Sequence, residues 1–520
     1  MDSVRSQYRL FNRTFVQLDI EPFPNESSPL DWTEERFKHV MQLKQEAIDV
    51  ARNKWADFFM VTDADAILSN PNTLKILISQ QRTIVSPMLN ITGSNTYSNF
   101  WCGMDENGYY QRTPDYLPIL FRHHQGCFDV PMVHSVVLID LRRKESNFIN
   151  FLPKRLDLFS DQIDDIIYFA QNNQRNRIKM HIVNTDYFGW MTAPLDARHQ
   201  LTTERLRFEE MLLQVAAYTD SPLEGLSYLA PERGPRELLN FDKIYIINLK
   251  RRPDRMKRMK ACMDILNINY TRIEAFDGRE LSESRLKELG VQMLDGYKDP
   301  YGERPLTLGE IGCFLSHYVI WKDIVEKGYE RVLIFEDDVR FKNGFKQNLF
   351  RAIKAADSLS QPWDLIYLGR KRLQNANEYT VSDDIPNLVW VDYTYWTISY
   401  ALSESGARKL IGQNPLSKMI AVDEYLPIMY DKHPNEEWKS HFEPRDLVAL
   451  SAEPLLLEPT HYTGEMGYIT DTENSRVVDD EELKAETLKE EEERLAQQTR
   501  GENTNVRDAL GSKSRLFGDL

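Results

Sequence analysis

The chain has 520 residues, 42% of them hydrophobic, and a formal net charge of −16 at pH 7. This length and apolar content suffice for about two to four domains with buried cores, which excludes a mainly disordered chain; the negative charge disfavours nucleic acid as a general partner, because no basic face would displace phosphate counterions. No apolar run is long enough to span a membrane, and residues 1–10 lack the apolar region of a signal peptide, so we expect a soluble protein.

The first half of the chain alternates helices and strands. Apolar residues at helical spacing predict an amphipathic helix over 32–55, which leads into an apolar strand over 58–62. Further elements are expected as strands over 83–88, 133–139 and 178–183 and a helix over 161–171. This alternation predicts an α/β domain over 1–220, and the proline-rich and glycine-containing stretch over 221–240 predicts a linker after it.

The second half repeats this organisation, and we expect a second α/β domain in tandem over 241–470. Its elements are predicted as a strand over 243–248, a basic segment over 249–258 that leads into a helix, a helix from 307 and a strand over 332–335. The remaining residues, 471–520, are charged and poor in apolar side chains, which predicts a disordered acidic tail.

Each half places a cluster of carboxylates directly after an apolar strand. Asp63 and Asp65 follow the first, and Glu336, Asp337 and Asp338 follow the second. In an open α/β sheet, ligands bind outside the carboxyl ends of the strands, and clustered carboxylates repel each other unless a cation lies between them. Mn2+ and Mg2+ accept such oxygen ligands and can bridge a diphosphate. A solvated turn is the alternative for either cluster alone, but the two occurrences favour a metal–nucleotide site in at least one of them.

A cationic turn follows the first strand of the second half. Arg251, Arg252 and Arg255 lie in this turn, where a nucleotide diphosphate could bind at the start of a helix. A solvated basic helix start is the alternative, and the residues alone do not separate the two readings.

Cysteines and glycosylation sequons bear on the compartment. The four cysteines, Cys102, Cys127, Cys262 and Cys313, are too scattered for a zinc site or a disulfide scaffold, so buried thiols are expected. Four sequons begin at Asn12, Asn25, Asn90 and Asn269. They would fit a secretory lumen, where the first two cysteines could oxidise to a pair.

Five segments of the second half, in their order, resemble the family 25 glycosyltransferases, which include bacterial lipopolysaccharide enzymes. They are residues 246–255, 274–278, 308–317, 335–338 and 422–426. The first half, through residues 63–65, 100–104, 130–134 and 164–167, joined to that domain is similar to the animal procollagen galactosyltransferases of this family. The likeness runs from about residue 32 to about residue 471.

The resemblance implies a fold and an activity. It implies two tandem GT-A (Rossmann-like) domains that use UDP-galactose and Mn2+ to transfer galactose, with inversion, to hydroxylysine of procollagen. It also implies residence in the lumen of the endoplasmic reticulum, and it would allow a lysyl hydroxylase partner and a homodimer.

The resemblance also implies roles in the second half, where we expect the chemistry. Asp338, helped by Glu336 and Asp337, would hold the metal and diphosphate, and His461 would complete the metal shell, with a structural histidine as the alternative. Asp423 or Glu424 would be the base that accepts the proton of the acceptor hydroxyl. The remaining donor-binding residues would be Asn248, Arg251, Arg252, Arg255, Asp277 and Gly278.

The first half offers a second set that resembles the glycosyltransferase domain of lysyl hydroxylases. Asp63 and Asp65 would bind metal, Trp101 would stack on a sugar or base, and Asp164 and Asp165 would lie near the acceptor. Core packing is the alternative for Trp101, and a helix N-cap is the alternative for the aspartate pair.

Both ends of the chain depart from the family pattern. Family members begin with a signal peptide and a first strand-helix-strand unit, which this sequence is expected to lack unless its true start lies upstream, so we expect the first-half site to be accessory or impaired. The final residues, Gly518-Asp519-Leu520, are a poor match to the usual retrieval signal. Two further hypotheses stay open: a catalytically inactive adhesion or binding protein, and a transferase with another acceptor.

Overall fold

The computed structural model describes residues 23, 25–28, 30–92, 97–105, 109–152, 164–218, 234–281, 283–300, 304–374, 376–462, 465 and 468–472. Met1–Tyr297 and Leu306–Glu473 belong to one compact unit, and Lys298–Pro305 and Asn474–Leu520 belong to a second. In the described part of the second unit, the backbone N–H of Asp299 donates to the carbonyl of Arg304 at 2.7 Å. Within the described ranges, no helix is both long and apolar enough to cross a membrane. Most of the predicted linker, the predicted tail after 472 and the start of the helix predicted over 161–171 lie outside the described residues.

The first half opens with the expected amphipathic helix. Helix α2 (Glu34–Asn53) begins after Thr33, whose hydroxyl caps the N–H of Arg36. It is followed by β1 (Phe58–Thr62), which pairs antiparallel with β8 (Val136–Asp140) at the edge of a five-stranded sheet of order β1-β8-β3-β9-β6. The inner strands and far edge are β3 (Ile84–Pro87), β9 (Met180–Val183) and β6 (Cys127–Val130). The acid-tipped strand β1 is therefore a half-buried edge strand.

Small elements complete the first half. A three-stranded sheet contains β2 (Ile67–Leu68), β10 (Gly189–Thr192) and β4 (Asn90–Thr92), and β5 (Phe100–Trp101) pairs with β7 (Met132–Val133). The helices are α3 (Thr73–Ser79), α4 (Tyr116–Leu120), η1 (Lys144–Phe148), α5 (Asp165–Arg175) and α6 (Leu201–Tyr218). The single strand predicted over 133–139 is interrupted between β7 and β8, because Ser135 adopts a left-handed conformation with φ of 63°.

The second half is built on an eight-stranded sheet of order β12-β11-β13-β18-β15-β19-β17-β16. The strands are β11 (Lys243–Asn248), β12 (Thr271–Glu274), β13 (Arg331–Glu336), β15 (Leu365–Arg372), β16 (Thr380–Ser382), β17 (Ile385–Trp390), β18 (Thr394–Ser403) and β19 (Ala449–Ala452). Strand β11 is parallel to both β12 and β13, whereas β18 is antiparallel to β13 and β15. The carboxyl ends of β11 and β13 therefore meet at one edge, next to the start of β18.

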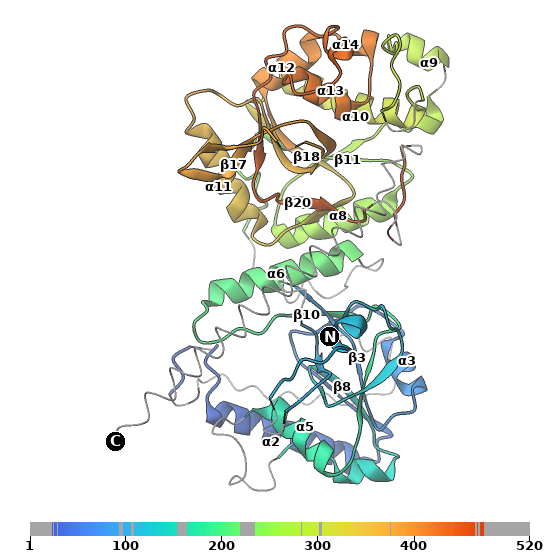
Figure 1. The fold of residues 1–520 in the computed structure, drawn as a ribbon, viewed down its shortest axis with the longest axis vertical. Helices are drawn as coiled ribbons and strands as arrows, with labels where there is room; N and C mark the ends of the chain where they lie inside the picture. Colours follow the sequence, from blue (N-terminus) through green and yellow to red (C-terminus); the bar gives the residue numbers. More distant parts are fainter. Residues whose placement is uncertain are drawn as a thin grey trace. The chain divides into compact units, whose positions relative to one another are not determined.

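Helices cover both faces of this sheet (Figure 1). One face packs against α10 (Leu308–Lys327), α12 (Glu404–Gly412) and α13 (Val422–Met429), around Trp321, Tyr400 and Tyr425. The other packs against α8 (Pro253–Leu266) and α11 (Phe345–Asp357), and α6 adds Leu213 and Ala216 to that core. The remaining elements are η2 (Gly278–Glu280), α9 (Glu283–Glu288), η3 (Pro415–Lys418), α14 (Glu436–Lys439) and the antiparallel pair β14 (Val339–Phe341) and β20 (Leu457–Pro459). The α/β class predicted from the sequence is confirmed.

Candidate active site

The acidic cluster of the second half lies at the carboxyl end of β13. Glu336 is the last residue of the strand, and Asp337 and Asp338 form the tight connection to β14. Thr460, which follows β20, donates both its backbone N–H and its hydroxyl to the carbonyl oxygen of Asp338, each at 2.7 Å. The pairing of β14 with β20 thus fixes the backbone that carries the acids.

Glu336 is held by donors from two other elements. Its Oε1 atom accepts from the hydroxyl of Thr397 at 2.6 Å and lies 3.2 Å from Nε2 of His317. The hydroxyl of Tyr400 accepts from the indole N–H of Trp321 and lies 2.9 Å from Nδ1 of His317, an arrangement that fits the tautomer with the proton on Nε2. Burial alone would raise the pKa of Glu336, but the interactions with His317 and Thr397 lower it overall.

Asp337 and Asp338 share a cation of the chain. Asn248 donates to Oδ2 of Asp337 at 2.6 Å, while Nη1 of Arg255 lies 3.2 Å from Oδ1 of Asp337 and 3.3 Å from Oδ2 of Asp338. Burial and the charges of Glu336 and Asp337 raise the pKa of Asp338 to about 7, against the opposing effect of Arg255. This carboxyl group is therefore only partly ionised at neutral pH without a further cation.

One oxygen of the cluster is left without a partner. Oδ1 of Asp338 is buried and has no hydrogen-bond partner among the described residues, and the same holds for Oδ1 of Asp423. An unpaired buried carboxylate oxygen is costly, and a hard divalent cation satisfies it. The oxygen-rich donor set of Glu336, Asp337 and Asp338 therefore fits Mn2+ or Mg2+.

The structure separates the two candidate bases at the start of α13. Glu424 is fully buried, and its Oε2 atom accepts from the hydroxyl of Tyr393 and lies 2.8 Å from Nε2 of His433. Asp423 is only half-buried. Burial and the charges of Glu336 and Glu424 raise the pKa of Asp423. Oε2 of Glu424 is thus occupied by internal hydrogen bonds, whereas Oε1 has no hydrogen-bond partner among the described residues. Asp423 is less buried than Glu424 and is the better candidate base.

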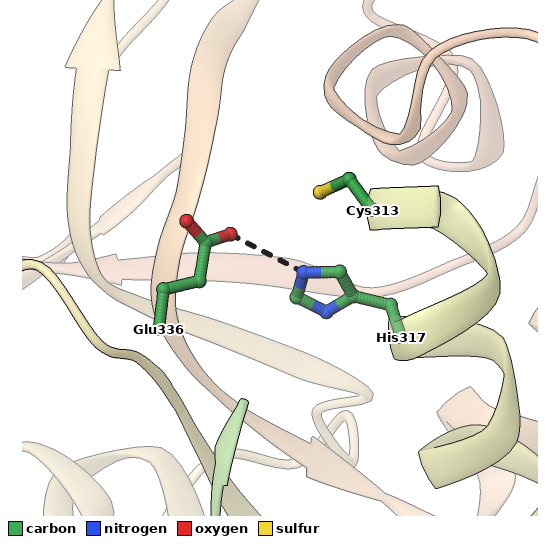
Figure 2. Close-up of side chains that lie close together, drawn as sticks. All are labelled: Cys313, His317 and Glu336. Carbon is green, nitrogen blue, oxygen red and sulfur yellow. Dashed lines mark hydrogen bonds and ion pairs between the residues drawn. The ribbon is translucent and has the colours of Figure 1, made fainter. Parts of the chain in front are cut away.

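The motif at residues 308–317 contributes to the site two side chains for which we predicted no role from the sequence. Cys313 and His317 are four residues apart on α10, so both point from one helix face toward Glu336, as Figure 2 shows. Their ligand atoms and a Glu336 oxygen lie within 4.8 Å of one another. Burial and the surrounding carboxylates raise the pKa of Cys313 well above its ordinary value, so the thiol stays protonated when no cation is bound.

The arginines of the basic turn converge on an internal anion. Asp471 lies 2.6 Å from Nη1 of Arg251, 3.0 Å from Nε of Arg252 and 3.5 Å from Nη2 of Arg255. Arg251 also pairs with Asp277 at 2.6 Å. The three guanidinium groups are mostly buried and not a solvated helix start. They form an anion-binding cluster, and Asp471 belongs to it although the sequence predicted a disordered tail from that residue.

Two further predicted site residues have structural contacts. A Cβ atom at Gly278 would lie 2.5 Å from backbone atoms of Leu308 and Gly309, so this glycine permits the close approach of η2 and α10. The ring of His461 lies edge-on to Tyr218, with 5.8 Å between ring centroids. Neither contact tests a role in donor or metal binding, and both roles stay predictions.

The acids of the first half are arranged differently. Lys44 of α2 pairs with Asp165 at 2.6 Å. Burial raises the pKa of Asp63, and the charge of Lys44 opposes that effect. Asp65 is exposed and accepts from the hydroxyl of Thr192 at 2.9 Å. A cation of the chain therefore lies near these acids, as Arg255 does in the second half.

The structure bears on the alternative roles of the first-half residues, which were a helix N-cap for the aspartate pair and core packing for Trp101. Asp164 is the N-cap of α5 and accepts the backbone N–H groups of Ile166 and Ile167 at 2.9 Å. Trp101 is half-buried, with its ring centroid 5.5 Å from that of Tyr110. All four cysteines are free thiols, so the pair that a secretory lumen would allow between the first two is not formed.

Comparison with known protein families supports the motif reading. A model described as glycosyltransferase family 25, N-terminal domain, matches residues 1–212. A second, described as glycosyltransferase family 25 (LPS biosynthesis protein), matches residues 241–426.

Individual relatives align over most of the chain. Procollagen galactosyltransferase 2 of Homo sapiens is 46% identical over 89% of this chain and 73% of its own length. Procollagen galactosyltransferase 1 of Danio rerio is 46% identical over 89% of this chain and 76% of its own length. A protein of Homo sapiens named inactive glycosyltransferase 25 family member 3 is 44% identical over 88% of this chain and 76% of its own length. The resemblance read from the sequence motifs is confirmed.

Proposed function

The chain belongs to glycosyltransferase family 25, and on this premise we propose that it transfers galactose from UDP-galactose to hydroxylysine of collagen-like chains, with the chemistry in its second half. The observation that carries this proposal is the pairing of an anion-binding arginine cluster with an acidic cluster that contains an unpartnered carboxylate oxygen. The proposal includes a GT-A fold for both halves and an accessory role for the first-half acids.

Different residues of the second half would bind different parts of the donor. Asp338, with Glu336 and Asp337, would hold Mn2+, and His461 would complete the shell. The ion, when bound, neutralises charge on the departing diphosphate. Arg251, Arg252 and Arg255 would bind the diphosphate oxygens at the place that Asp471 now occupies, and Asn248, Asp277 and Gly278 would line the nucleotide side of the same edge.

Asp423 would act as the base. The hydroxyl oxygen of hydroxylysine forms a bond to C1 of galactose while the bond from C1 to the UDP oxygen breaks, and the hydroxyl proton moves to a carboxylate oxygen of Asp423. Attack from the face opposite UDP inverts the configuration at C1. Burial and the charges of Glu336 and Glu424 raise the pKa of Asp423, and a more basic carboxylate accepts a proton more readily.

An inactive binding protein is the alternative, since one relative carries the printed name of an inactive family member. The acids at 336–338 and at 423 are present in this chain, which favours the enzyme. We also propose the lumen of the endoplasmic reticulum as its location, on family grounds alone. A lysyl hydroxylase partner and a homodimer remain part of the same proposal.

The decisive test measures both UDP binding and galactose transfer. We expect UDP to bind only with Mn2+ present, and galactose to pass from UDP-galactose to a hydroxylysine peptide. Asp338→Ala should lower transfer by about a hundredfold or more. Asp383→Ala, in the exposed turn between β16 and β17, is the matched control and should retain full activity. Metal-independent or absent UDP binding by the wild type would favour the binding protein.

A further inference from the structure

Trp396 has an unusual backbone conformation beside the site. Its φ is 69°, a left-handed value that a bulky residue rarely adopts. Strands β15 and β18 pair Gly369 with Ser399 but Lys371 with Tyr395, so three residues of β18 lie opposite one residue of β15. A bulge of this kind redirects a side chain. As a result Trp396 is only half-buried, whereas the other residues over 391–400 are buried.

Other aromatic rings extend from this tryptophan. The ring centroids of Trp396 and Tyr462 are 6.0 Å apart, and their planes are tilted by 45°. His461, the preceding residue, packs edge-on against Tyr218 of α6. Tyr462 is 38% exposed and Tyr218 is 37% exposed. We call Trp396, Tyr462 and Tyr218 the aromatic row; His461, which we assign to the metal shell, contacts Tyr218 and precedes Tyr462 but is not part of the row.

The aromatic row is anchored directly to the acidic cluster. Thr397, next to Trp396, donates to Glu336 at 2.6 Å. Thr460, which precedes His461 and Tyr462, donates twice to the carbonyl of Asp338. The segments that carry Trp396 and Tyr462 are therefore fixed to Glu336 and Asp338, whereas Tyr218 belongs to α6.

We propose that the aromatic row binds the proline-rich, polyproline II backbone of the acceptor strand on either side of the reacting hydroxylysine. This inference rests on the proposed function and adds the surface that selects the acceptor. Polyproline II segments are rigid and have no internal hydrogen bonds, and proteins recognise them with aromatic side chains that pack on proline rings. A tyrosine hydroxyl at such a surface donates to the free carbonyls of the strand.

The charges and hydroxyls around the row suit that ligand. The hydroxyl group of Tyr462 can donate to a carbonyl oxygen. Glu465 accepts the backbone N–H of Tyr462 at 2.8 Å. Cations of the chain also border the row: Lys371 Nζ lies 5.6 Å from the ring centroid of Trp396, and Arg340 Cζ lies 5.7 Å from that of Tyr218. Such donors suit the free carbonyl oxygens of a polyproline II strand.

The test uses two single-stranded acceptor peptides, with hydroxylysine flanked either by prolines or by alanines. Trp396→Gly removes the ring while glycine keeps the positive φ, and Tyr462→Ala removes its neighbour. Each variant should raise KM for the proline-flanked peptide by about tenfold. Each should leave KM for UDP-galactose within about twofold. Tyr379→Ala, which removes an aromatic ring that is 63% exposed elsewhere, is the control and should change neither KM. An equal change for both peptides, or a raised KM for UDP-galactose alone, overturns the assignment.

A binding measurement separates this surface from the transferase activity. A proline-rich peptide without hydroxylysine is titrated into the full chain by calorimetry. Binding by the wild type that Trp396→Gly weakens by about tenfold supports the surface even if no galactose is transferred. Transfer by the wild type together with peptide binding that neither variant weakens leaves the proposed function intact and overturns the aromatic row as its acceptor site.

Discussion

Asp471 lies 2.6 Å from Arg251, and the two charges link a segment near residue 470 to the turn after β11. The same carboxylate faces Arg252 and Arg255. It therefore occupies the cluster of cations that we assign to the donor diphosphate, and an anionic ligand has to compete with it.

Asp471→Asn should strengthen UDP binding in the presence of Mn2+. The substitution keeps the shape of the side chain but removes the negative charge that neutralises the arginines, so the diphosphate meets less competition. We expect Kd to fall by about threefold to tenfold in a calorimetric titration. Weaker binding by this variant would show instead that Asp471 orders the arginines for the nucleotide.

Metal binding should depend on pH near neutrality. The pKa of Asp338 is raised to about 7, so below that pH a proton occupies the carboxyl group and competes with the cation, whereas above it the carboxylate is free. The affinity for Mn2+, followed by electron paramagnetic resonance between pH 6 and 8, should increase with pH by up to about tenfold per unit below the pKa. An affinity that does not change over this range would contradict the assignment of Asp338 as a ligand.

Thr397→Val should impair the site through Glu336 and Asp423, because the Thr397 side chain is hydrogen-bonded to both. Valine has nearly the same shape but cannot donate to Glu336, which loses its shortest hydrogen bond. We expect Mn2+ affinity and kcat to fall by about tenfold or more, as for other residues that orient metal ligands. Thr380→Val, at an exposed position of β16, provides the matched control. Equal Mn2+ affinity and equal kcat in the two variants would show that Thr397 does not support the site.

Substitutions of the two acids at the start of α13 should have different effects. Asp423→Asn should retain UDP binding and stability but lose transfer, because the amide cannot accept the hydroxyl proton. Glu424→Ala should lower the free energy of unfolding by about 2–4 kcal/mol, since it leaves Tyr393 and His433 buried without their partner. Urea unfolding and kcat measured on both variants check this division. A stable Glu424→Ala protein with normal packing but no activity would assign the base to Glu424.

The local pattern of the sequence located the elements and the acids. An apolar run that ends in carboxylates predicts a strand end, and β13 indeed ends at Glu336. The first acidic strand was also predicted. Periodicity does not reveal whether a strand lies at the edge of its sheet, and β1 lies at an edge. Element order and the acid positions were therefore predictable, whereas strand neighbours were not.

The supporting residues were harder to predict because their contacts are distant in the sequence. Thr397 lies 61 residues from Glu336 along the chain, and only the pairing of β13 with β18 brings them together. Cys313 and His317 lay in a recognised motif, and their spacing on one helix face was the available signal. Asp471 was assigned to the tail because composition reports the average of a segment and not the partners of one carboxylate.

The most direct test compares Asp338→Ala with Asp63→Ala in galactose transfer to a hydroxylysine peptide under saturating UDP-galactose and Mn2+. Because the second half combines the acidic cluster at 336–338 with the arginine cluster, we predict that Asp338→Ala loses activity by about a hundredfold or more while Asp63→Ala retains most of it. Full activity of Asp338→Ala together with loss in Asp63→Ala would contradict the account and place the chemistry in the first half.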